Sequence, residues 1–168
     1  GGGAIDIEVK TIDEFLIVYL AADVKEAMGA NILNTMLEAI KIPLENITNG
    51  KSLMAILSNY ATKSLVKSEC EVNIKLLSNS LETTIKNEKK IELASKFAKL
   101  DIYRATTHNK GIFNGIDAVV IATGNDWRAI EAGGNAFAVK NGKYEGLTTW
   151  TFEEETNKLK GELTIPMP

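Results

Sequence analysis

The spacing at which apolar residues recur changes along this chain, and the order of these changes constrains its fold. Apolar and polar residues alternate at residues 5–9 and again at residues 66–74, as in a strand with one wet face. Between residues 91 and 139 the apolar positions recur at helical spacing instead. Strands followed by a block of helices, rather than strict β–α alternation, predict the α+β class.

Individual elements follow from the same patterns. The predicted strands are residues 5–9, 15–22, 53–57, 66–74, 147–152 and 159–165. The predicted helices are residues 26–40, 91–100, 107–122 and 126–139. The first two strands should form one antiparallel hairpin and the last two another, with the apolar run at 15–22 covered on both faces. Pro43 fits the end of the first helix, and the lysine-rich residues 78–90 indicate a surface loop.

Composition excludes several classes of function. The chain has 168 residues, of which 45% are hydrophobic, enough for one substantial core or two smaller ones. A net charge of −3 gives no basic footprint for a nucleic acid. The single Cys70 and single His108 argue against a disulfide framework and a clustered metal site, so no metal is expected. The longest apolar run, residues 118–122, is far shorter than the ~20 residues that span a bilayer, and we expect a cytoplasmic protein without membrane contact.

A cation, several amides and an acid occur within residues 109–126. The Lys110 ammonium could stabilise negative charge on a carbonyl oxygen, although a lone lysine near a helix start is more often a solvated side chain. Asp126 could keep such a cation protonated and aimed, or it could only cap the helix that it opens. The residues alone leave both alternatives open.

Other polar residues also have two interpretations. Asn59 and Asn114 could orient a carbonyl oxygen or the lysine, or they could be caps. Arg104 would suit a carboxylate through its two-pronged guanidinium, whereas a surface ion pair is the commoner outcome. His108 is best explained as a helix-start or hydrogen-bonding residue. The turn Met28-Gly29-Ala30-Asn31 opens a helix whose free N–H groups suit a phosphate or a carboxamide, or it is only a tight turn.

The order and spacing of these residues resemble one enzyme family, the class II 3-hydroxy-3-methylglutaryl-coenzyme A (HMG-CoA) reductases. The motifs that carry the resemblance are Glu26-Ala27-Met28-Gly29-Ala30-Asn31 with Asn34-Thr35-Met36, Ile56-Leu57-Ser58-Asn59, Tyr103-Arg104-Ala105-Thr106-Thr107-His108-Asn109-Lys110-Gly111, Asn114-Gly115-Ile116-Asp117, Ala122-Thr123-Gly124-Asn125-Asp126 and Gly146-Leu147-Thr148-Thr149-Trp150. They cover essentially all of the chain, and several are specific to the family.

The resemblance implies an oxidoreductase and assigns a role to each candidate residue. Two hydrides from NADPH or NADH would convert HMG-CoA into mevalonate and free coenzyme A, with no metal. Lys110 and Asp126 match the family's catalytic lysine and aspartate. The substrate-binding matches are Asn59, Arg104 and Asn114, and the cofactor-binding matches are Glu26, Met28, Gly29, Ala30 and Asn31.

The resemblance also implies the architecture. Residues 1–58 would be part of a small ferredoxin-like NAD(P)-binding domain, and residues 59–168 part of a larger mixed α/β domain that binds HMG-CoA. The active site of the family lies at a dimer interface, which implies a homodimer or a higher oligomer.

The length of one predicted helix bears on how that site is assembled. If residues 110–122 form one straight helix, its ends are roughly 18 Å apart. Lys110 and Asp126 from different subunits would then complete one site. A bend at Gly111 or Gly115 would instead allow both residues of one subunit to meet.

Two positions and both ends depart from the family pattern. Glu26 stands where aspartate is usual, which lengthens a side chain at the nicotinamide end, and Gly133-Gly134-Asn135 stands where Gly-Ala-His is frequent, which should affect packing. The chain begins with Gly1-Gly2-Gly3, and we expect it to be a piece of a longer protein. The family's catalytic glutamate and histidine would lie outside it, so these residues alone should form an incomplete catalyst. The alternative function is a non-catalytic module that binds a nucleotide or coenzyme A.

Overall fold

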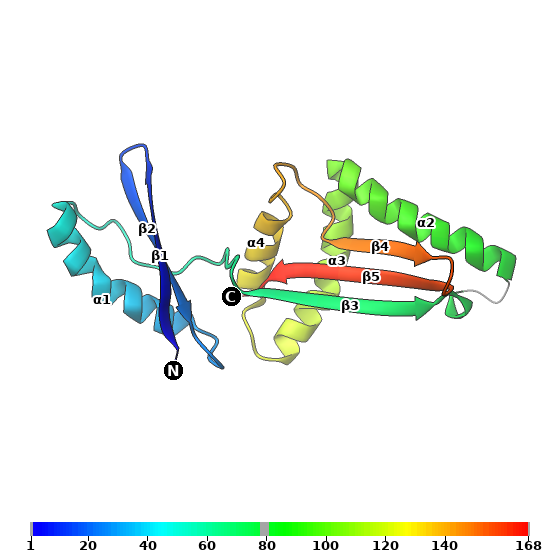
Figure 1. Ribbon diagram of the computed structural model, residues 1–168, viewed down its shortest axis with the longest axis horizontal. Helices are drawn as coiled ribbons and strands as arrows, with labels where there is room; N and C mark the ends of the chain where they lie inside the picture. The colour runs from blue at the N-terminus through cyan, green and yellow to red at the C-terminus, as the bar shows by residue number, and fades with distance from the viewer. Residues whose placement is uncertain (1, 78–80, 168) are drawn as a thin grey trace. The chain divides into compact units, whose positions relative to one another are not determined.

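The computed structural model describes residues 2–77 and 81–167, and its fold is α+β (Figure 1). The chain divides into two compact units, Gly1–Ser58 and Asn59–Met167. The first unit contains a β-hairpin and one helix, and the second contains a three-stranded sheet and three α-helices. None of the helices in the described ranges has the length and apolar character needed to cross a bilayer.

The first unit opens with the antiparallel hairpin that the sequence predicts. Strand β1 (Gly3–Ile12) pairs with β2 (Phe15–Asp23), and the register closes at Ile12 opposite Phe15. Asp13 occupies the turn with a φ of 54°, a left-handed conformation that aspartate tolerates better than most residues. Helix α1 (Ala30–Thr48) follows the hairpin.

Pro43 does not end α1, which contradicts the prediction from the sequence. The helix passes through Pro43 and continues to Thr48. A proline removes one backbone donor and crowds only the turn before it, so a helix with enough other bonds can extend on both sides of it. The helix ends instead at Asn49, whose left-handed φ of 54° is typical of the residue after a helix.

The two buried strands predicted for this unit are also corrected. Residues 53–57 form no strand, and Leu53 and Met54 are 75% and 68% exposed. The backbone N–H of Leu57 donates to Oδ1 of Asn34 on α1 at 3.0 Å, so a side chain replaces a strand partner there. Residues 15–22 do form β2, but Phe15 and Leu16 are half-exposed because the described hairpin has no further layer that covers both faces.

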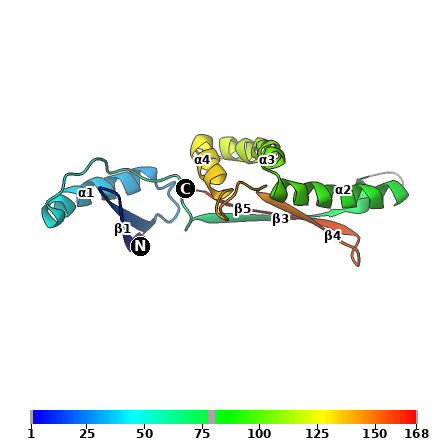
Figure 2. The same ribbon diagram turned by 90° about the horizontal axis from the view of Figure 1, so that it is seen from above.

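The second unit is built on an antiparallel sheet with the order β3-β5-β4. Its elements are β3 (Leu65–Asn73), the short 3-10 helix η1 (Ile74–Leu76), α2 (Leu81–Leu100), α3 (Ile102–Ala122), α4 (Trp127–Phe137), β4 (Thr148–Glu153) and β5 (Lys158–Pro166). The predicted C-terminal hairpin is therefore confirmed, and β3 joins it on the other edge of β5. Figure 2 shows the helices on one side of this sheet.

In this unit the helical boundaries differ most from the prediction at the starts of α2 and α3. Residues 81–90, predicted as a surface loop, form the first half of α2, whereas residues 78–80 of the predicted loop lie outside the described residues. Helix α3 begins at Ile102, five residues before the predicted start. The reason is Asp101, whose carboxylate accepts the Arg104 N–H at 2.7 Å and caps the helix.

The core of the second unit lies between the sheet and the helices. Its buried members are Phe113, Ile116 and Val120 of α3, Ile130 of α4 and Ile165 of β5. The alternate residues of β3 and β5 carry ion pairs, Lys158 with Glu71 at 2.6 Å and Lys160 with Glu162 at 3.4 Å. One face of the sheet is therefore apolar and covered, and the other is charged.

Candidate active site

Helix α3 carries three of the predicted site residues. Lys110 and Asn114 are four residues apart, so they lie on one face of the helix, and both are exposed. An ammonium beside an amide on an open helix face can stabilise the negative charge that develops on a carbonyl oxygen. Arg104 is half-buried and lies about 9 Å along the axis from Lys110, on a different side of the helix.

Asp126 caps α4. Its Oδ1 accepts the N–H of Arg128 at 3.1 Å and that of Ala129 at 3.2 Å, and the Arg128 guanidinium lies 3.7 Å away. The carboxylate is exposed, so a further partner can reach it. Within the described residues Asp126 and Lys110 form no ion pair, and the structure does not bring the two predicted catalytic residues together in one chain.

Asn59 lies in the irregular segment that precedes β3, and it is exposed. Its backbone contacts α4, where a Cβ on Gly133 would come within 2.4 Å of the Asn59 carbonyl oxygen. Only glycine at residue 133 allows this approach. The next residue, Gly134, leaves room for Phe113, because a Cβ there would come within 2.7 Å of the ring atom Cζ. Gly133 and Gly134, in the triplet Gly133-Gly134-Asn135 that departs from the usual family pattern, therefore have a packing role.

The predicted cofactor-binding turn lies in the first unit, between β2 and α1. Gly29 is the residue before α1, and its φ of 91° is one that other residues rarely adopt. A Cβ at Gly29 would also come within 3.0 Å of Val24 Cγ1. No side chain caps the helix, so the N–H groups of its first turn, at Ala30 and Asn31, remain available to a polar ligand.

The other cofactor candidates, Glu26 and Met28, are exposed beside that turn. Met28 is 53% exposed, a large fraction for an apolar side chain. An exposed thioether next to free helix N–H groups can contact the flat, apolar face of a ring while the amides bind its polar substituents.

His108 is confirmed as a hydrogen-bonding residue, although it lies within α3 rather than at its start. Its Nε2 shares a hydrogen bond with Thr148 Oγ1 at 2.6 Å. Burial lowers the pKa of His108 below its ordinary value of 6.5, and the positive charges of Arg104 and Lys99 add to the shift. The imidazole is therefore neutral at neutral pH and serves as a link between α3 and β4.

Asn109 is the residue whose importance the sequence analysis missed. It is 1% exposed, and both ends of its amide are bonded to the backbone before β4. A signal was present in the sequence, because Asn109 lies four residues from both Ala105 and Phe113 on the buried row of α3. A polar residue in an apolar helical row has to find hydrogen-bond partners.

A pair of acids lies where α3 meets α4. Burial and the neighbouring Asp117 carboxylate raise the pKa of Glu131 above its ordinary value of 4.5. Asp117 is also on the same face of α3 as Lys110 and Asn114, and its Oδ1 is buried without a hydrogen-bond partner among the described atoms. In the part of the chain that the structure describes, no three or more His, Cys, Asp or Glu side chains group to hold a metal ion.

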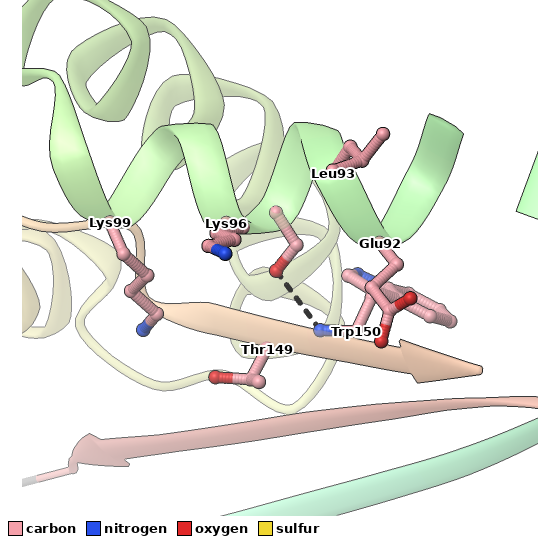
Figure 3. Close-up of a pocket in the computed structure, with 7 residues that line it drawn as sticks. Glu92, Leu93, Lys96, Lys99, Thr149 and Trp150 are labelled. Carbon is pink, nitrogen blue, oxygen red and sulfur yellow. Dashed lines mark hydrogen bonds between the residues drawn. The ribbon is translucent and has the colours of Figure 1, made fainter. Parts of the chain in front are cut away.

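A surface pocket of about 470 Å³ lies between α2 and β4, and Figure 3 shows its lining residues. Lys96 and Lys99 line it from α2, and Trp150 lines it from β4. The dashed line in Figure 3 is the bond from the Trp150 N–H to the Ser95 hydroxyl, 3.0 Å long. None of the predicted site residues lines this pocket, so it is separate from the α3 and α4 residues described above.

Comparison with known proteins identifies the family. Residues 1–168 match the family model described as hydroxymethylglutaryl-coenzyme A reductase. The chain is 44% identical over 171 residues to 3-hydroxy-3-methylglutaryl-coenzyme A reductase of Archaeoglobus fulgidus, a match that covers 99% of this chain and 38% of that protein. It is 36% identical over 169 residues to the probable 3-hydroxy-3-methylglutaryl-coenzyme A reductase of Borreliella burgdorferi, covering 99% of this chain and 39% of that protein.

Comparison with solved structures points to the same family. A 3-hydroxy-3-methylglutaryl-coenzyme A reductase structure from Streptococcus pneumoniae is 57% identical with a TM-score of 0.92, covering 100% of this chain and 46% of that one. A structure of the class II enzyme from the same organism, bound to NADPH in open conformations, is 57% identical with a TM-score of 0.91, covering 100% of this chain and 41% of that one. The chain spans about two fifths of the length of the curated relatives that it matches. It belongs to the hydroxymethylglutaryl-coenzyme A reductase family.

Proposed function

We propose that the protein that contains these residues reduces HMG-CoA to mevalonate, with Lys110 as the residue that stabilises the reacting carbonyl oxygen. The observation that carries the proposal is the exposed pair of Lys110 and Asn114 on one face of α3, within a chain that matches the reductase family from end to end. The overall reaction consumes HMG-CoA, two reduced nicotinamide nucleotides and two protons. It yields mevalonate, coenzyme A and two oxidised nucleotides.

Each of the two reductions moves negative charge onto an oxygen. The bound nicotinamide supplies the hydride, and the carbon–oxygen double bond that accepts it leaves charge on the oxygen. The Lys110 ammonium stabilises this oxyanion, with the Asn114 amide four residues along the same face as a second donor. Asp126 orients the lysine, and Arg104 and Asn59 bind the hydroxymethylglutaryl group.

The first unit is the proposed nucleotide-binding part, and the second is the proposed substrate part. In the first unit the free N–H groups of Ala30 and Asn31, with Glu26, Met28 and Gly29, hold the nicotinamide nucleotide. NADPH is the first candidate, because a structure that is 57% identical is described as bound to it. The single Cys70 is an exposed free thiol, which fits a reducing compartment, so we place the reaction in the cytoplasm.

We further propose a homodimer or higher oligomer with a shared site. Helix α3 continues from Lys110, near its middle, through Gly111 and Gly115 to Ala122 without a break, and Asp126 lies beyond that end. A site that needs both residues is then completed by Lys110 of one subunit and Asp126 of its partner.

Substitution of Lys110 tests the proposal. In the full protein that contains this chain, Lys110→Ala should lower the rate of NADPH oxidation with HMG-CoA by roughly 100-fold or more, because a charged oxyanion donor is lost. Lys75→Ala, which removes an exposed lysine on η1, is the matched control and should leave the rate unchanged. A Lys110→Ala protein with the wild-type rate would refute the catalytic assignment. Binding of NADPH and coenzyme A by a wild-type protein that never turns over would support a non-catalytic binding module instead.

A further inference from the structure

Asn109 joins α3 to the backbone that leads into β4. Its Oδ1 accepts the Leu147 N–H at 2.8 Å, and its Nδ2 donates to the Glu145 carbonyl oxygen at 2.9 Å. The side chain is 1% exposed, so water cannot replace either partner. One amide therefore satisfies two backbone groups that lie 36 and 38 residues away in the sequence.

The segment that Asn109 holds, residues 145–148, is also tied to α2. The Gly146 N–H donates to the Ala98 carbonyl oxygen at 2.8 Å, and the Lys99 ammonium donates to the Gly146 carbonyl oxygen. Figure 3 shows Lys99 reaching from α2 towards the start of β4. A Cβ at Gly146 would come within 2.9 Å of the Ala98 Cβ and 3.1 Å of His108 Cδ2, so the segment packs closely against both helices and only glycine fits there.

Lys110 follows Asn109 directly on α3. Successive residues of a helix are related by a fixed rotation of about 100° and a rise of about 1.5 Å. The α3 turn is fixed at Asn109 and also by the neighbouring bond between His108 and Thr148. The direction in which the side chain of residue 110 projects from the helix is therefore fixed as well. That direction is away from the buried row, because Lys110 is exposed.

We propose that Asn109 is a positioning residue for Lys110: its two bonds to residues 145 and 147 set the position and rotation of the α3 turn from which the lysine projects. This inference rests on the proposed function, since it gives Asn109 a role in turnover only if Lys110 acts on the substrate. The competing explanation is that Asn109 only satisfies two buried backbone groups and contributes to stability.

Ser95 provides the matched control. It is 3% exposed on α2, and its hydroxyl accepts the Trp150 N–H at 3.0 Å, so it too is a buried side chain bonded to the backbone of β4. It is not on the helix that carries Lys110. Both Asn109→Ala and Ser95→Ala should lower the melting temperature of the full protein that contains this chain.

The two variants should differ in turnover, measured well below their melting temperatures at saturating HMG-CoA and NADPH. Asn109→Ala should lower kcat roughly 10-fold to 100-fold with little change in KM, because the reacting groups are misplaced. Ser95→Ala should retain kcat within about twofold. In a Lys110→Ala background, Asn109→Ala should cause no further loss. Equal kcat values for Asn109→Ala and Ser95→Ala would overturn the inference.

An isosteric variant gives a second test that does not depend on the stability of Asn109→Ala. In Asn109→Asp one oxygen still accepts the Leu147 N–H, but an ionised carboxylate cannot donate to the Glu145 carbonyl oxygen. Burial favours the protonated acid, which restores the donor. The ratio of its kcat to that of the wild type should therefore rise as the pH falls from about 8 to about 5.5. A ratio that does not change with pH would overturn the positioning role.

The outcomes separate this inference from the proposed function. If Lys110→Ala turns over at the wild-type rate, the proposed function fails. If Lys110→Ala is inactive while Asn109→Ala behaves as Ser95→Ala does, only the positioning role of Asn109 fails.

Discussion

An uninterrupted helical span separates Lys110 from Asp126: α3 continues from Lys110, near its middle, through Gly111 and Gly115 to its end at Ala122, and Asp126 caps α4 beyond it. The 12 rises from residue 110 to residue 122 amount to roughly 18 Å along the helix axis. That span is longer than a lysine and an aspartate side chain laid end to end. If both are catalytic, we expect them to come from different subunits, as in the oligomer proposed above.

Mixed dimers test this arrangement. A dimer of one Lys110→Ala subunit and one Asp126→Asn subunit contains one site with both residues intact and one site with neither. Such heterodimers, purified through two different affinity tags, should show about half of the wild-type rate per dimer, although each homodimer is inactive. Heterodimers without activity would mean that both residues of a site come from the same subunit.

Asp126 has a structural role as a helix cap that can be separated from its proposed catalytic role. Asparagine is as good a cap as aspartate, so Asp126→Asn should keep the free energy of unfolding within about 0.5 kcal/mol of the wild type. Asp126→Ala should lose about 1 kcal/mol, because the N–H groups of Arg128 and Ala129 lose their acceptor. Denaturant unfolding measures both effects.

Turnover should respond differently to these two variants. Both should lose roughly 100-fold or more in kcat, because neither side chain can hold a charge next to the lysine. An Asp126→Asn protein that is stable and fully active would show that Asp126 is only a cap.

Phe113 and Gly134 should behave as a coupled pair. Gly134→Ala places a methyl group within 2.7 Å of Phe113 Cζ in the core and should cost about 1–3 kcal/mol of stability. Phe113→Leu removes the ring and leaves a cavity of its own. The double variant should lose less than the sum of the two single losses, since the methyl group then fills part of that cavity. Losses that add within about 0.5 kcal/mol would contradict this contact.

Glu131 should make stability depend on pH. Its pKa is raised by burial and by the Asp117 carboxylate, so the folded state binds its proton more tightly than the unfolded state does. Its favourable contribution is complete below the ordinary pKa of 4.5 and is lost as the pH rises through the raised folded-state value. Glu131→Gln imitates the protonated form and should raise the melting temperature at pH 7.

The advantage of Glu131→Gln should shrink as the pH is lowered towards 4, where the wild-type side chain is itself protonated. Glu154→Gln, an exposed acid in the turn between β4 and β5, is the control and should show little effect at either pH. A melting temperature for Glu131→Gln that equals the wild type at pH 7 would contradict the repulsion between the two acids.

Local patterns in the sequence were sufficient for much of the fold. Alternation at residues 5–9 and the apolar run at residues 15–22 predicted the hairpin of β1 and β2. Helical spacing predicted α3 and α4, because it records which side of a helix is apolar. The same patterns failed at residues 81–90, whose lysine-rich stretch lacks a clear apolar stripe although it is helical. They also failed at residues 53–57, which are apolar yet exposed.

The candidate site, like the fold, was only partly predictable from the sequence. The sequence by itself determined its residue types and the family: the ordered motifs around Lys110, Asp126 and Gly29 lie in a chain that matches the reductase model from end to end. Only the tertiary structure decided which groups those residues contact. It placed β3 beside β5, and it set the Asn109 amide against the backbone of residues 145 and 147. Periodicity shows that a residue is buried, but the partner that satisfies a buried amide lies far away in the sequence and depends on how the elements pack.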